Sequence, residues 1–271
     1  MTESRTPDFR KRLAETRRVV VKVGTSNLTD KDSRLDSNKI EKIVDEIMGL
    51  RKEGRDVILI TSGAIGAGVG RMNLQGRPRQ MPLLQAAAAV GQAILMQVYE
   101  RDFAAYGQPI AQVLLTREDF GSEDRRKNLR NTIDTLLSWK VVPIINENDT
   151  VAVEEIKVSD NDLLSALVAT NVNADLLLIL SDVDGLYTGD PKGNAKRTLI
   201  RTVSDVNSDV EEIAGEATSG FGGMHTKIRA AKVVGERGIP CVVANGSERN
   251  VMKRVLAGEE IGTLFLPKRK P

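Results

Sequence analysis

The segment from Ile144 to Asp162 has the residue types best suited to chemistry. Nine of its nineteen residues carry an amide or a carboxylate side chain. A packed core does not tolerate that density, because each buried polar group needs a partner. The segment therefore indicates a substrate site. The plainer alternative is a polar surface loop whose Ser159 and Asp160 cap the helix that follows.

The residues directly before Asn146 place this segment at the end of a strand. Val141, Val142, Ile144 and Ile145 form a short apolar run that is typical of a buried strand. In open α/β sheets, ligands bind outside the carboxyl ends of the strands. The predicted position is therefore that of a ligand site.

Lys22 follows three valines and precedes Val23 and Gly24. A lysine in such a run is expensive to bury unless its ammonium group emerges at the strand end beside an anion. Gly24 would let the backbone approach a ligand, and Thr25 and Ser26 add hydroxyl and amide donors. The alternative is a lysine on an edge strand whose ammonium group reaches solvent.

Two further segments have glycines before an expected helix. Thr61 to Gly70 contains Ser62 and joins a strand, a turn of small residues and a helix start, which points free amides at an anion. Gly220 to Lys227 adds a lysine in the first turns of a helix, which suits a polyphosphate. Neither has the spacing of a GxGxxG or Walker motif. Close helix packing is the alternative for the first segment, and a flexible loop for the second.

Ser181 and Asp182 follow another apolar run, Leu176 to Leu180. Hydroxyl and carboxylate groups at a strand exit suit a ribose or a base, and they equally suit an ordinary turn.

Apolar runs alternate with helix-period segments along the chain, which is typical of an α/β fold with an open, mainly parallel sheet sandwiched between helices. The expected strands are Val19 to Val23, Val57 to Thr61, Ile110 to Leu115, Val141 to Ile145, Leu176 to Leu180 and Pro240 to Ala244. The clearest helix begins after Asp36 or Ser37 and stops near Gly54.

We expect residues 1–17 to be a basic N-terminal extension that is mostly solvated, followed by a single domain over residues 18–271. A soft division near residue 173 separates a substrate half, about 18–173, from a nucleotide half, about 174–266.

Composition excludes several classes of function. The net charge of +2 implies no nucleic-acid partner. The N-terminal stretch lacks an apolar signal core and no later segment has eighteen continuous apolar residues, so we expect neither export nor membrane insertion. One cysteine, Cys241, fits a reducing compartment, so we expect a cytoplasmic protein. One histidine cannot build a histidine-rich zinc site, and no metal site is predicted.

These segments in this order resemble the amino acid kinase family over residues 18–266. The strings Asn146 to Asp149 and Asp160 to Asp162 resemble members that phosphorylate glutamate. The resemblance implies the amino acid kinase fold and the ATP-dependent phosphorylation of the side-chain carboxylate of L-glutamate to L-glutamyl 5-phosphate, the first step of proline biosynthesis. It implies ATP and Mg²⁺ as cofactors.

By that resemblance, Lys22, Lys227 and Asp162 would be catalytic, with Asp162 orienting the two lysines. Ser62, Asp149 and Asn161 would bind glutamate, with Asp149 as the partner of its α-amino group. The nucleotide would contact Lys22, Gly24, Ser181, Asp182, Phe221, Gly222, Gly223, Met224, His225, Thr226 and Lys227. Magnesium would ride mainly on the nucleotide phosphates, since the sequence has no compact carboxylate cage.

The resemblance also implies a homo-oligomer, feedback inhibition by proline and a glutamyl phosphate reductase that takes up the product. Two departures stand out: the glycine loop before Lys227 is about two residues shorter than the family pattern and lacks its threonine, and we expect no C-terminal PUA domain. The alternatives are another kinase of the family, acting on aspartate, N-acetylglutamate or carbamate, and a non-catalytic amino acid sensor.

Overall fold

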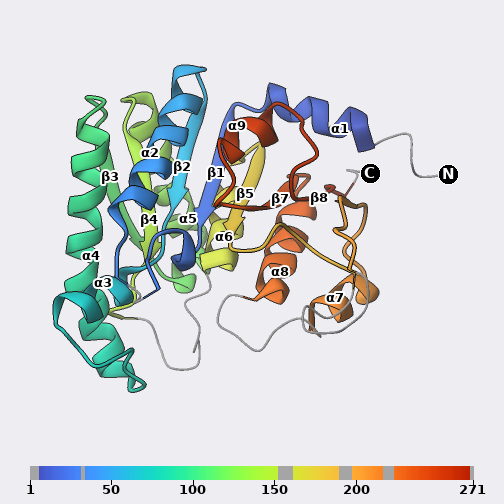
Figure 1. Ribbon diagram of the computed structural model, residues 1–271. Coiled ribbons are helices and arrows are strands. Elements are labelled where there is room, and N and C mark those ends of the chain that lie inside the picture. The colour runs from blue at the N-terminus through green and yellow to red at the C-terminus, as the bar shows by residue number, and fades with distance from the viewer. Residues whose placement is uncertain (1–5, 32–33, 152–160, 189–196, 216–222, 269–271) are drawn as a thin grey trace.

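Among the residues that the structure describes, eight strands form one sheet that lies between two layers of helices (Figure 1). The structure is a computed structural model that describes residues 6–31, 34–151, 161–188, 197–215 and 223–268. The strand order is β3-β4-β2-β1-β5-β7-β8-β6, and the paired strands run parallel except for β7 and β8. The strands are β1 (Arg18–Val23), β2 (Asp56–Ile60), β3 (Ile110–Leu115), β4 (Val142–Glu147), β5 (Leu176–Ser181), β6 (Thr202–Val203), β7 (Cys241–Asn245) and β8 (Thr263–Phe265).

The expected fold class is therefore confirmed. The helices are α1 (Thr6–Arg12), α2 (Ser37–Lys52), α3 (Ala64–Arg71), α4 (Met81–Ala104), α5 (Glu123–Ser138), α6 (Asn161–Asn171), α7 (Ser208–Gly215), α8 (Met224–Gly235) and α9 (Val251–Leu256). Helix α2 begins as expected, because the Asp36 side chain accepts hydrogen bonds from the amides of Asn38 and Lys39. It ends at Lys52, and Gly54, two residues further on, has a φ of +83°, which suits glycine.

Alternate residues of the central strands divide the core into two clusters. On β1, Val19 and Val21 pack into a cluster with α2, α4 and α9, whereas Val20 packs into another with α5, α6 and α8. Because side chains alternate across a strand, both faces of the sheet are covered by helices. The continuous apolar runs in the sequence have this cause.

Helix α4 is long and apolar enough to cross a membrane by length and composition alone. In the fold, its Leu95, Tyr99 and Phe103 are fully buried in the core. Its outer side exposes Leu83 and Val90. The length and apolar character of α4 are therefore those of a helix that covers one face of the sheet.

The expectation that the N-terminal basic residues are mostly solvated is wrong for Arg10. This side chain is 1% exposed, and its guanidinium donates to four backbone carbonyls, those of Arg201, Glu259, Ile261 and Gly262. Helix α1, blue in Figure 1, lies beside α9, drawn in red. A guanidinium group has enough donors to satisfy several carbonyls at once, which sequence composition does not reveal.

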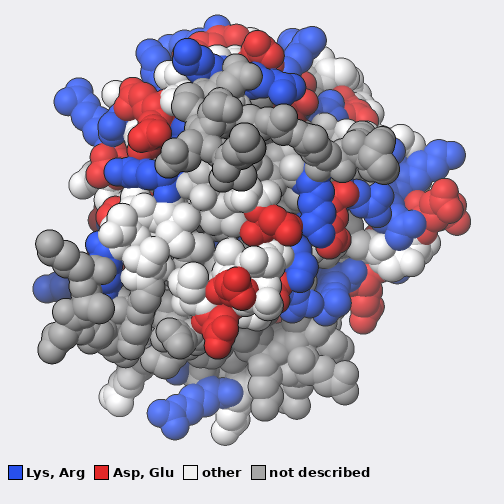
Figure 2. All heavy atoms as spheres, turned by 90° about the vertical axis from the view of Figure 1, so that its right-hand side faces the viewer, with Lys and Arg blue, Asp and Glu red and all other residues white. Residues whose placement is uncertain are grey.

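The surface shown in Figure 2 carries basic and acidic side chains interleaved. No broad area of one sign stands out among the described residues on this face.

Candidate active site

One cavity of about 250 Å³ lies at the carboxyl ends of β1, β2, β4 and β5. It is lined by nine of the residues that the sequence singled out, namely Lys22, Gly24, Ser62, Asp149, Asn161, Asp162, Ser181, Asp182 and Lys227. Strands β1 and β5 are directly paired in the middle of the sheet, and their ends meet here. Residues that are far apart in the chain therefore line one cavity.

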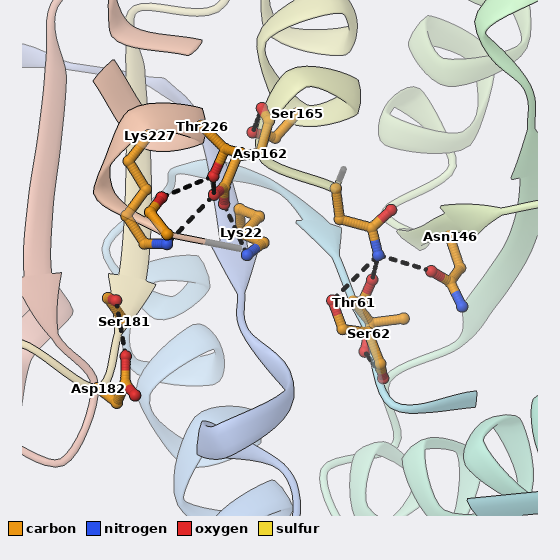
Figure 3. A network of polar contacts seen from close by, with 12 residues as sticks. Lys22, Thr61, Ser62, Asn146, Asp162, Ser165, Ser181, Asp182, Thr226 and Lys227 are labelled. Carbon is orange, nitrogen blue, oxygen red and sulfur yellow. Dashed lines mark hydrogen bonds and ion pairs between the residues drawn. The ribbon is translucent and has the colours of Figure 1, made fainter. Parts of the chain in front are cut away.

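Asp162 holds two buried lysines at one end of this cavity (Figure 3). Its Oδ1 lies 2.6 Å from the Lys22 Nζ, and its Oδ2 lies 3.2 Å from the Lys227 Nζ. The hydroxyl of Thr226 donates to Oδ2 at 2.6 Å. Asp162 is 1% exposed, so this cluster is almost dry.

The charges of this cluster are not balanced. Burial alone would raise the pKa of Asp162, but Lys22 and Lys227 oppose it, and the pKa lies below its usual value. The carboxylate also lies in the first turn of α6, where the helix dipole favours an anion. Two ammonium groups and one carboxylate leave one excess positive charge, which would attract an anionic phosphoryl group.

A second polar network, which includes Thr61, Ser62 and Asn146, lies on the other side of the view in Figure 3. The Asn161 Nδ2 lies 2.7 Å from the Thr61 carbonyl oxygen, 3.0 Å from the Ser62 Oγ and 3.0 Å from the Asn146 Oδ1. The Asn146 Nδ2 donates in turn to the Gln92 Oε1 of α4 at 2.9 Å. These bonds fix the orientation of the Asn161 amide.

The Asn161 Oδ1 is buried and accepts no hydrogen bond from the residues that the structure describes. A buried acceptor without a donor is costly, and such atoms often face a ligand. In a cavity of this kind, Oδ1 is suited to accept from an ammonium group or a hydroxyl of a bound molecule.

Asp149 follows β4, and its carboxyl group is the second in the cavity whose pKa departs from the usual value. Burial raises its pKa to about 6, and the positive charge of Arg77 opposes that shift. Arg77 lies between α3 and α4 and also lines the cavity. This end of the cavity thus carries one carboxyl group, that of Asp149, and one guanidinium cation, that of Arg77.

The start of α3 supplies backbone donors. Gly63 adopts a φ of +92°, which brings Ala64, Ile65 and Gly66 to the cavity wall. The first amides of a helix have no acceptor within the helix, so they are available to a ligand.

The nucleotide-side residues are only partly brought to the cavity. The Ser181 Oγ lies 3.1 Å from the Asp182 Oδ1, and both residues line the wall at the end of β5. Thr226 reaches the cavity cluster through Asp162. Gly223 precedes α8, Met224 is buried and His225 is exposed, and none of these three lines the cavity. Phe221 and Gly222 lie outside the described residues.

The sequence reasoning missed two residues at this site, Arg77 and Gln92. Arg77 follows no strand, so no strand-end signal points to it. Gln92 did carry a signal, because it shares the buried face of α4 with Ala88 and Leu95. A glutamine on such a face needs a partner, and here that partner is Asn146.

The family model described as "Amino acid kinase family" matches residues 17–245, and the chain belongs to this family. The chain is 51% identical over 256 residues to the glutamate 5-kinase of Caldanaerobacter subterraneus subsp. tengcongensis, covering 94% of this chain and 69% of that protein. It is also 51% identical over 262 residues to the glutamate 5-kinase of Clostridium acetobutylicum, covering 96% and 98%. Within the family, the chain therefore groups with the glutamate 5-kinases.

Two solved structures support the fold alone. The carbamate kinase from Giardia lamblia bound to AMP-PNP has a TM-score of 0.66 at 17% identity, covering 94% of this chain and 100% of that one. The UMP kinase from Bacillus anthracis has a TM-score of 0.62 at 18% identity, covering 94% and 97%. These similarities agree with the observed sheet between two layers of helices.

Proposed function

We propose that this protein transfers the γ-phosphoryl group of ATP to the side-chain carboxylate of L-glutamate, giving L-glutamyl 5-phosphate and ADP, the first step of proline biosynthesis. The observation that carries the proposal is the pair Lys22 and Lys227 held by Asp162, in the same cavity as Asp149. The identity of about one half with several glutamate 5-kinases supports the choice of substrate.

The chemistry needs no general base. A glutamate side chain has a reference pKa of about 4.3, so the attacking carboxylate is already an anion at neutral pH. One of its oxygens attacks the γ-phosphorus, the bond from phosphorus to the bridging oxygen breaks, and the electron pair leaves with ADP. The barrier comes mainly from bringing two anions together, so alignment and positive potential are the means of catalysis.

In this proposal, Lys22 and Lys227 contact the transferring phosphoryl group, and Asp162 positions them. Donors that face developing negative charge stabilise the transition state more than the ground state. The Asn161 Oδ1, which has no donor among the described residues, would bind glutamate together with Ser62 and Asp149, and Asp149 would pair with its ammonium group.

ATP would lie toward Ser181, Asp182 and Gly24, and the predicted loop from Phe221 to Lys227 would contact its phosphates. Among the described residues there is no group of three or more histidine, cysteine or acidic side chains that could hold a metal. The family resemblance implies a Mg²⁺ ion, which would be held mainly by the nucleotide phosphates and would neutralise their charge.

Several further proposals concern partners. The exposed Leu83 and Val90 of α4, beside the edge strand β3, support a homo-oligomer, which light scattering can test. Proline as feedback inhibitor, a glutamyl phosphate reductase as the consumer of the reactive product, and a cytoplasmic location are proposed from the family resemblance.

The proposed function is tested by trapping the acyl phosphate with hydroxylamine, which forms a hydroxamate. The protein is incubated with MgATP and, in separate reactions, L-glutamate, L-aspartate, N-acetyl-L-glutamate or carbamate. We expect a hydroxamate and stoichiometric ADP with L-glutamate alone. Turnover of another acceptor in place of glutamate would support one of the other kinases, and glutamate binding without ADP release would support a sensor.

A further inference from the structure

Three cationic side chains line the cavity among the residues that the structure describes: Lys22, Lys227 and Arg77. The first two share Asp162, and both are nearly fully buried. Arg77 comes from the segment between α3 and α4, and its side chain is exposed. The cavity thus has a dry pair of cations and a separate cation that borders solvent.

The proposed acceptor carries three charges, namely two carboxylates and one ammonium group. If the side-chain carboxylate faces Lys22 and Lys227, the α-carboxylate needs another partner. That partner must lie close to Asp149, because the α-ammonium and the α-carboxylate are attached to the same carbon. Arg77 is the lining cation that meets this condition, since it lines the same cavity as Asp149 and its positive charge lowers the pKa of that carboxyl group.

We propose that Arg77 binds the α-carboxylate of the amino acid acceptor and, with Asp149, selects for a free α-amino acid; this inference rests on the proposed function. The guanidinium group presents two parallel N–H donors that match the two oxygens of a carboxylate. The Asp149 carboxylate and the Arg77 guanidinium group are thus complementary to the α-ammonium group and the α-carboxylate of the substrate.

The amides at the start of α3 are the competing partner. They line the same cavity beside Ser62, but they are neutral, and they do not depend on the Arg77 side chain. Substituting Arg77 leaves those donors in place. The two partners are therefore separable by experiment.

The test compares L-glutamate with its α-amide, in which a neutral amide replaces the α-carboxylate and the side-chain carboxylate is unchanged. We expect Arg77→Gln to raise KM for L-glutamate by about 10- to 100-fold, the range for a lost charge-assisted hydrogen bond. The KM for the α-amide should change less than about threefold, because that contact is already missing. Turnover number and KM for MgATP should stay close to wild type.

Two more substitutions of Arg77 and one control variant make the outcome specific. Arg77→Glu should raise KM for L-glutamate further than Arg77→Gln, and Arg77→Lys should recover part of the loss. Arg79→Gln is the matched control, because Arg79 lies two residues away, is exposed and does not line the cavity. If wild type turns the α-amide over too slowly, its inhibition constant against L-glutamate replaces KM.

Two results would overturn the inference. One is a KM for L-glutamate in Arg77→Gln within about twofold of wild type. The other is an equal rise in KM for L-glutamate and for its α-amide. That result would mean that Arg77 stabilises the segment between α3 and α4 and does not bind the α-carboxylate. Failure of the proposed function looks different, because the wild-type protein would then form no hydroxamate with L-glutamate.

Discussion

Asp162 has the greatest influence on the charge of the cavity. It is itself an anion and would repel a phosphoryl group, so its influence comes from the lysines that it holds. By pairing with both Lys22 and Lys227, it lets two ammonium groups lie close together in a nearly dry place. Without the carboxylate, their mutual repulsion and loss of hydration would be uncompensated. The carboxylate thus allows a concentrated positive site to exist before any ligand arrives.

Lys227 should be needed for turnover more than for binding. We expect Lys227→Ala to lower the turnover number by at least about a hundredfold, because removal of one donor that faces developing charge costs about 3–4 kcal/mol. Steady-state ADP release measures this effect. Lys232→Ala is the control from the same helix, since Lys232 lies on the surface and pairs with Glu211. A near-normal rate for Lys227→Ala would exclude this lysine from phosphoryl transfer.

Asp149 should make glutamate use depend on pH. With a pKa of about 6 in the free protein, Asp149 is protonated below that pH and then cannot pair with the substrate ammonium group. We expect kcat/KM for glutamate to fall about tenfold per pH unit below about pH 6. It should level off above that pH, where Asp149 is ionised.

Asp149→Asn tests this assignment directly. It should raise KM for glutamate and remove the fall in kcat/KM between about pH 5 and pH 7, while KM for MgATP stays unchanged. A fall that persists in the variant with the same midpoint would assign the titration to another group.

At the scale of elements, α3 and α4 cross at a contact that only glycine allows. A Cβ on Gly68 would lie 1.8 Å from the Ala87 carbonyl oxygen, and one on Gly91 would lie 1.7 Å from that of Ala64. Ala64 begins α3 and lines the cavity, and Gln92 of α4 holds Asn146. This helix contact therefore sets the distance between two walls of the site.

Gly91→Ala should consequently weaken both stability and glutamate binding. We expect the free energy of unfolding to fall by about 1–3 kcal/mol, the usual range for overpacking, with a raised KM for glutamate. Chemical denaturation and steady-state kinetics measure the two effects. Gly49→Ala is the control, because a Cβ there meets nothing within 4 Å, and alanine in a helix should stabilise by up to about 1 kcal/mol. Equal effects of the two substitutions would contradict the close contact.

The sequence predicted the long elements well and the short ones poorly. Six apolar runs correspond to β1, β2, β3, β4, β5 and β7. All but the edge strand β3 are mostly buried, and strands buried on both faces need continuous apolar residues. Strands β6 and β8 have two and three residues, too few to show a period. Polarity at strand ends pointed to Lys22 and Asp149, and the polar segment after β4 also included Asp162; all three line one cavity. Arg77 reaches the cavity from an exposed loop that carries no such signal.

For the whole molecule, Arg10 links the N-terminal helix to the far edge of the sheet. Its four carbonyl partners belong to residues near β6 and β8, which follow it by about 190 to 250 positions. Through these four hydrogen bonds, Arg10 ties the N-terminal helix to the segments around β6 and β8.

Arg10→Met should therefore destabilise the protein although it leaves the site untouched. We expect a loss of roughly 1.5–3 kcal/mol in the free energy of unfolding, from charge-assisted hydrogen bonds to carbonyls that stay buried. Lys11 is the next residue and is exposed, so Lys11→Met should change the free energy of unfolding by less than about 0.5 kcal/mol. Denaturant titration of both variants, with turnover measured alongside, checks this, and equal stability of the two would contradict it.

Strand β1 lies between β2 and β5, and its pairing with both has a practical consequence. A cut near residue 173 would leave Lys22 and Asp162 on one fragment and Lys227 on the other. Each fragment would then expose one unpaired edge, that of β1 or that of β5, and the two edges match in register over five residue pairs. The two fragments could therefore serve as a split enzyme, in which phosphoryl transfer is restored only when the fragments reassemble.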